Sequence, residues 1–104
     1  MSDVLAADAS VRGQAVVPTA QAARYVTQMC KHFAHKALVT QEGDSGSIAF
    51  AAFGACRLRA ADGVLTLVAE AASPAQLEQL QDVVTRHLRR FAFREELQVA
   101  WQAA

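Results

Sequence analysis

The chain lacks an excess of charge of either sign, and it lacks long apolar runs. Its 104 residues include ten basic and ten acidic side chains, so the formal net charge is zero. Dedicated nucleic-acid-binding domains usually carry a clear basic excess, and we therefore do not expect nucleic acid as a partner. No apolar stretch approaches the roughly 18 residues that a membrane-spanning helix needs. We accordingly expect no membrane partner.

Cysteine is equally scarce, with only Cys30 and Cys56 present. The first seven residues contain no basic segment of the kind that opens a signal peptide. Two cysteines in such a chain are typical of reduced thiols in a reducing compartment. We therefore expect a cytoplasmic protein.

Recognisable catalytic motifs are also missing. The sequence has no glycine-rich phosphate loop, no nucleophile elbow and no evident pair of catalytic carboxylates. We therefore do not expect an enzyme.

The spacing of apolar residues predicts an alternation of strands and helices. The second helix has the clearest start, because Ser73, Pro74 and Gln76 form a capping box with proline at the first helical position. Asp62-Gly63 between two alternating runs is a strong hairpin signal. The expected elements are a strand over 14–17, a helix capped by Thr19 and ending near 34–36, strands over 37–41, 47–53, 55–60 and 64–70, a helix from 74 to about 91, and a strand over 97–102.

Hairpin-linked strands with only two helices favour an antiparallel sheet. We predict an α+β fold, a two-layer sandwich of order β-α-β-β-β-β-α-β with both helices on one face of the sheet. Residues 1–12 are expected to be a flexible lead-in, and residues 13–104 a single domain.

The string Cys30-Lys31-His32-Phe33-Ala34-His35-Lys36 contains the residue types that bind iron or zinc. His32 and His35 are three apart, so they share one face of a helix and could chelate one ion. Cys30 points about 160° away from His32 on a continuous helix, so a three-ligand site needs the helix to end early or needs distant partners such as Cys56 or His87. The alternative is that these are structural or surface histidines.

Other residues are candidates for binding a ligand, which at Arg57 and Arg59 would be anionic. Arg57 and Arg59 share one face of a predicted strand, about 7 Å apart. Lys31 and Lys36 flank the histidines, and His87 borders the apolar stripe of the second helix. The alternative for the arginines is an ordinary polar outer face of the sheet.

Three stretches together resemble the small bacterial proteins known as domain of unknown function 2218. They are Arg24-Tyr25-Val26-Thr27-Gln28-Met29 followed by CKHFAHK, then Cys56-Arg57-Leu58-Arg59, then VVTRHLRRFAFREELQVAWQ, and the resemblance covers about residues 14–102. The family has no established activity, and its signature corresponds here to Cys30, Lys31, His32, His35, Lys36, Arg57, His87 and Phe91.

The resemblance implies a link to iron handling, because members stand alone or joined to flavin-containing siderophore-interacting reductases. We therefore expect a small binding domain for a metal or an iron complex, with a siderophore-interacting reductase or a second copy of the chain as partner. The alternative is a non-catalytic module for protein interaction or homodimerisation.

Overall fold

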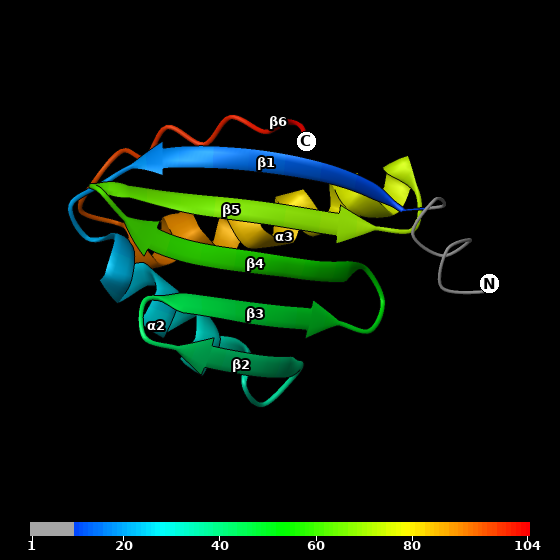
Figure 1. Cartoon of the computed structure of the whole chain (residues 1–104), viewed down its shortest axis with the longest axis horizontal. Helices are drawn as coiled ribbons and strands as arrows, with labels where there is room; N and C mark the ends of the chain where they lie inside the picture. Colours follow the sequence, from blue (N-terminus) through cyan, green and yellow to red (C-terminus); the bar gives the residue numbers. More distant parts are fainter. Residues whose placement is uncertain (1–9) are drawn as a thin grey trace.

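The computed structural model describes residues 10–104 and has two layers, a six-stranded antiparallel sheet and two helices. Figure 1 shows both helices behind the same face of the sheet, as the sequence predicted. The elements are β1 (Val11–Pro18), α2 (Ala22–Phe33), β2 (Leu38–Glu42), β3 (Ser45–Phe50), β4 (Gly54–Ala61), β5 (Val64–Ala71), α3 (Pro74–Phe91) and β6 (Gln102–Ala103). The strands lie in the order β2-β3-β4-β5-β1-β6, which places β1 beside β5 and not beside β2. The α+β two-layer fold and the element order are confirmed.

The core lies between the helices and the covered face of the sheet. Strand β5 alternates buried and half-buried residues, with Leu65, Leu67 and Ala69 fully inside. Helix α3 contributes its inward stripe, and Leu80 and Val84 are completely buried. The hydrophobic effect of this one shared core holds the two layers together.

The sharp turns follow the local chemistry that the sequence displays. Asp62 and Gly63 both have positive φ, 54° and 75°, as a two-residue hairpin between β4 and β5 requires. Ser73 caps α3, since its hydroxyl accepts the backbone N–H of Gln76 at 3.2 Å. Both predictions are confirmed.

Helix α2 begins later than predicted. Thr19 is not its N-cap: the cap residue is Gln21, and no side chain caps it. The Thr19 hydroxyl instead accepts the backbone N–H of Gln21 and donates to the Glu95 carboxylate. The Thr19 hydroxyl therefore bonds Glu95, which is distant in the sequence, and does not cap the helix as the local pattern predicted.

The two ends of the described chain also depart from the expected boundaries. Strand β1 already includes Val11 and Arg12, which pair with β5, so this part of the predicted lead-in belongs to the sheet. Residues 1–9 of that predicted lead-in lie outside the described residues. The final strand shrinks to Gln102–Ala103, because the alternation of Leu97, Val99 and Trp101 reflects packing against the core and not pairing along a strand. Within residues 10–104, no helix is long and apolar enough to cross a membrane.

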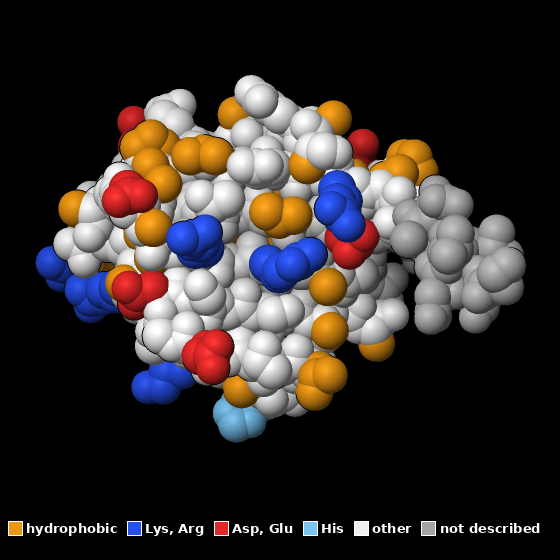
Figure 2. Space-filling model, viewed as in Figure 1, with side chains coloured by type: hydrophobic (Ala, Val, Ile, Leu, Met, Phe, Trp, Pro, Cys, Tyr) orange, Lys and Arg blue, Asp and Glu red, His pale blue; other side chains and the backbone are white. Residues whose placement is uncertain are grey.

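The other face of the sheet is not covered by helices. Figure 2 shows basic side chains over the middle of this face, with hydrophobic ones scattered among them. Arg57 and Arg59 are exposed here, whereas Cys56 and Leu58 between and beside them are buried under the helices. This alternation is the hydrophobic-in, polar-out pattern of a half-covered antiparallel strand.

Candidate functional site

Two histidines meet where the C-terminal halves of α2 and α3 approach each other. The ring centroids of His32 and His87 are 5.1 Å apart, with their planes tilted by 46°. Phe33 and Phe91 pack edge-on against His32, with centroids at 4.8 and 5.5 Å. On α3, His87 and Phe91 are four residues apart and therefore share the helix face that borders the core stripe. We call these four residues the His32–His87 cluster.

Hydrogen bonding defines which nitrogen of His87 is free. Its Nδ1 lies 2.7 Å from the carbonyl oxygen of Val83. A carbonyl can only accept, so Nδ1 carries the proton and the Nε2 lone pair of a neutral His87 remains available.

His32 also has an uncommitted nitrogen. Its Nε2 is buried and has no hydrogen-bond partner among the described residues. Burial lowers the pKa of His32 below its ordinary value of 6.5, and the charges of His87, Lys36 and Arg90 lower it further. At neutral pH the ring is therefore uncharged, which is the form that binds metals.

The ligand set predicted from the sequence is not assembled as expected. Helix α2 ends at Phe33, and His35 is exposed in the turn that follows. Cys30 faces the core, where burial raises its thiol pKa. In residues 10–104 no three His, Cys, Asp or Glu side chains are grouped so that they could hold a metal ion. The helical rotation turns the Cys30 thiol into the core, while His87 of α3 packs against His32.

The remaining predicted residues divide between solvent and core. Lys31 and Lys36 are exposed at the end of α2, on the helical side of the sheet. Arg57 and Arg59 lie on the open face, so the sheet separates them from His32 and His87. Cys56 is fully buried, and burial raises its pKa to about 12, so its thiol is protonated at neutral pH.

A second constellation lies near the N-terminal end of α2, where three segments converge. The Tyr25 hydroxyl of α2 donates to the Glu95 carboxylate, which follows α3. Thr19, which follows β1, donates to the same carboxylate at 3.0 and 3.1 Å. Burial raises the pKa of Tyr25 to about 12, and the bond to Glu95 and its negative charge add to this effect. The phenol therefore stays neutral at neutral pH.

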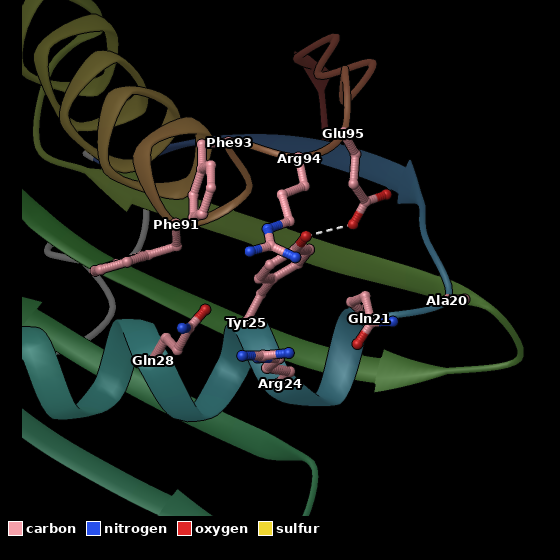
Figure 3. Close-up of a pocket in the computed structure, with 9 residues that line it drawn as sticks. All are labelled: Ala20, Gln21, Arg24, Tyr25, Gln28, Phe91, Phe93, Arg94 and Glu95. Carbon is pink, nitrogen blue, oxygen red and sulfur yellow. Dashed lines mark hydrogen bonds between the residues drawn. The ribbon is translucent and has the colours of Figure 1, made fainter.

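A cavity of about 490 Å³ opens beside this tyrosine (Figure 3). Arg24 and Gln28 line it from α2, while Phe93 and Arg94 line it from the segment after α3. Phe91 belongs to both places, because it lines the cavity and also contacts His32. Sequence reasoning missed this pocket, because no local pattern pairs Arg24 with Arg94, which lies 70 positions further along the chain.

The comparisons with known proteins identify the family. The sequence profile described as "Uncharacterized protein conserved in bacteria (DUF2218)" matches residues 14–102. The chain belongs to this family. The expected resemblance is therefore confirmed, and it covers every residue of the two constellations.

A solved protein structure is also similar to this chain. The NMR structure of PA4090 from Pseudomonas aeruginosa is similar to this chain with a TM-score of 0.75 and 36% sequence identity. The alignment covers 88% of this chain and 95% of that one. No curated protein matches the chain.

Proposed function

We propose that this member of the family is a small cytoplasmic domain that binds an iron or zinc complex through His32 and His87, without catalysing a reaction. The observation that carries the proposal is the pair of adjacent imidazoles with free Nε2 atoms. Sequence reasoning placed His32 and His35 first and named His87, with Cys30 and Cys56, among the residues that could complete a site. The proposal prefers His87 to the predicted His35 and Cys30, because His87 packs against His32 whereas His35 is exposed and Cys30 faces the core.

The spacing of the two rings agrees with a shared ion. With metal–nitrogen distances of about 2.0–2.1 Å, two imidazoles on one tetrahedral ion have centroids roughly 5 Å apart. The observed separation is 5.1 Å. The bond from His87 Nδ1 to the Val83 carbonyl resembles the outer contacts that orient ligating histidines and keep the second nitrogen free.

Two protein donors leave at least half of the coordination positions of an ion unfilled. We therefore expect the ion to arrive as a complex that brings its own ligands. Lys36 and Arg90 act on His32 through their positive charge, which disfavours a free divalent cation and favours an anionic complex. Lys31 and Lys36, exposed beside the cluster, are placed to attract such a complex. A siderophore-interacting reductase, or a second copy of the chain, remains the predicted partner.

The test is calorimetric titration of the protein at pH 7.5 with ferric citrate and, separately, with zinc chloride. We expect His32→Ala and His87→Ala each to weaken binding at least about tenfold, since each removes one of two donors. His35→Ala is the matched control, because it removes an exposed imidazole from the same segment, and it should leave binding unchanged.

Three results would count against the proposal. Absence of binding to the wild-type protein would reject the metal function, and a loss of binding in His32→Ala and His35→Ala but not in His87→Ala would favour the ligand set predicted from the sequence. Equal effects of all three substitutions would indicate non-specific association. Circular dichroism of each variant establishes that it is folded.

A further inference from the structure

The cavity beside Tyr25 carries more positive charge than the protein itself neutralises. Arg24 and Arg94 both line it (Figure 3), and within residues 10–104 the ion pairs are Arg12–Glu70 and Arg86–Asp82, so neither lining arginine has a carboxylate partner. The first turn of α2 contains no acidic residue, so the positive end of the helix dipole is also uncompensated there.

The single carboxylate of this pocket is already engaged. Glu95 accepts hydrogen bonds from Tyr25 and Thr19, and it does not form an ion pair with either arginine. Two guanidinium groups and one carboxylate leave the lining with a net charge of one positive, since the phenol of Tyr25 is neutral. A monoanion completes this balance, whereas a dianion would be repelled by Glu95.

The remaining lining residues indicate which chemical group of a ligand would lie beside its charge. Phe91 and Phe93 line the same cavity, and Phe93 is 76% exposed although it is a large apolar side chain. The guanidinium carbon of Arg94 lies over the Phe93 ring, 5.4 Å from its centre, so the charge sits directly beside an aromatic wall. The Gln28 Oε1 atom is buried without a hydrogen-bond partner among the described residues, so it can accept a donor from a ligand.

We propose that this pocket binds a small aromatic monocarboxylate whose carboxylate sits between Arg24 and Arg94 and whose ring lies against Phe91 and Phe93. A planar carboxylate matches the fork of a guanidinium. The volume of about 490 Å³ falls within the range of small-molecule sites. A hydroxyl group on the ligand ring would donate a hydrogen bond to the Gln28 Oε1 atom, which has no donor among the described residues. The site shares Phe91 with the His32–His87 cluster but uses neither histidine, so substitutions of the two arginines test it separately from metal binding.

The test follows amide chemical shifts of the full chain during titration with 4-hydroxybenzoate. We expect the shifts to concentrate in residues 20–28 and 91–95. The neutral analogue 4-hydroxybenzamide, which has the same ring and hydroxyl, should bind at least about tenfold more weakly, since charge-assisted hydrogen bonds are roughly twice as strong as neutral ones. Inorganic phosphate, largely a dianion at pH 7.5, should also bind more weakly than the carboxylate.

Substitutions then assign the charge. Arg24→Gln and Arg94→Gln should each weaken 4-hydroxybenzoate binding at least about tenfold. Arg86→Gln is the matched control, because this exposed arginine of α3 is paired with Asp82 outside the pocket. Arg24→Lys and Arg94→Lys retain the charge without the planar fork and should recover part of the affinity. They guard against a folding defect in the glutamine variants.

Several outcomes would overturn the inference. They are no shift changes in the two segments, equal binding of the benzamide, tighter binding of phosphate, or an equal loss in Arg86→Gln. Ferric citrate binding that survives Arg24→Gln while 4-hydroxybenzoate binding is lost would separate this pocket from the metal proposal.

Discussion

At the scale of single residues, Cys30 and His32 illustrate how two neighbours in a motif come to have different environments. They are two positions apart on α2, and the helical rotation of about 100° per residue turns them to nearly opposite sides. Cys30 is 3% exposed in the core, while His32 meets His87 at the edge of the two helices. The residue types from Cys30 to Lys36 suggest one metal site. The helical geometry instead places Cys30 in the core and His32 in the His32–His87 cluster.

The half-buried ring of His32 makes the stability of the fold depend on pH. Its folded-state pKa lies below 6.5, so between the two values the unfolded chain binds a proton more readily than the folded chain. The free energy of unfolding is therefore at its full value above pH 6.5 and falls as the pH drops toward the folded-state pKa. We expect urea denaturation to show this loss between pH 7.5 and 5.5, and His32→Gln to reduce it.

His35→Gln serves as the control for that measurement, because the side chain is exposed. A pH dependence that survives His32→Gln unchanged, or that disappears in His35→Gln, would contradict the environment described for His32.

At the scale of elements, α2 and β3 pack so closely that one glycine is required between them. A Cβ at Gly46 would lie 2.5 Å from the Sγ atom of Cys30 and 3.5 Å from Val26 Cγ1. The thiol of Cys30 therefore fills the space above Gly46 as a small hydrophobic group. This packing explains the burial of Cys30 without any ligand.

The contact between Gly46 and Cys30 predicts a coupled pair of substitutions. Gly46→Ala should cost about 1–3 kcal/mol of unfolding free energy, because the added methyl group overpacks the interface. In the double variant with Cys30→Ala, the smaller side chain makes room, so the combined loss should fall short of the sum by at least about 0.5 kcal/mol. Urea denaturation of the single and double variants measures the coupling.

The combination of Gly46→Ala with Ser73→Ala is the control for this double-mutant comparison. Ser73→Ala removes the cap of α3, far from Gly46, at a cost of about 1 kcal/mol. Its effect should add to that of Gly46→Ala, and additivity in the Cys30 pair as well would refute the packing argument.

At the scale of the whole molecule, Glu95 ties together segments from both ends of the described chain. Its partners Thr19 and Tyr25 are 76 and 70 residues away in the sequence. Both partner side chains are largely buried, so their hydroxyl groups depend on this carboxylate for a hydrogen-bond acceptor. The tie positions the segment after α3 against α2 and so shapes the cavity beside Tyr25.

Removal of this tie has two measurable consequences. Glu95→Ala should cost about 1–3 kcal/mol of unfolding free energy, because two buried hydroxyl groups lose their acceptor. Tyr25 is the only tyrosine of the chain, so absorbance at 295 nm follows its ionisation alone. The wild-type pKa should be about 12, and Glu95→Ala should lower it while burial keeps it above 10.

The direction of the associated pH effect follows from the same values. A raised pKa favours the protonated phenol in the folded state, so this contribution to stability is complete below pH 10 and is lost as the pH rises through about 12. A wild-type tyrosine that titrates near 10 while the protein remains folded would show that Glu95 does not hold it.

Local interactions explain which features the sequence determined by itself. The Ser73 cap, the Asp62-Gly63 hairpin and the apolar stripes of both helices depend on residues a few positions apart, and all are observed. The fold class follows from them, because hairpin-linked strands and two amphipathic helices have few ways to bury their apolar faces.

Only the tertiary structure decided how distant residues combine. The Thr19 hydroxyl bonds Glu95 instead of capping a helix, His87 packs against His32, and Arg94 lines the same cavity as Arg24. The physical reason is that these contacts depend on how α2 and α3 dock on one sheet. No local spacing encodes that docking, because many sequences with the same apolar pattern could place the helix edges differently.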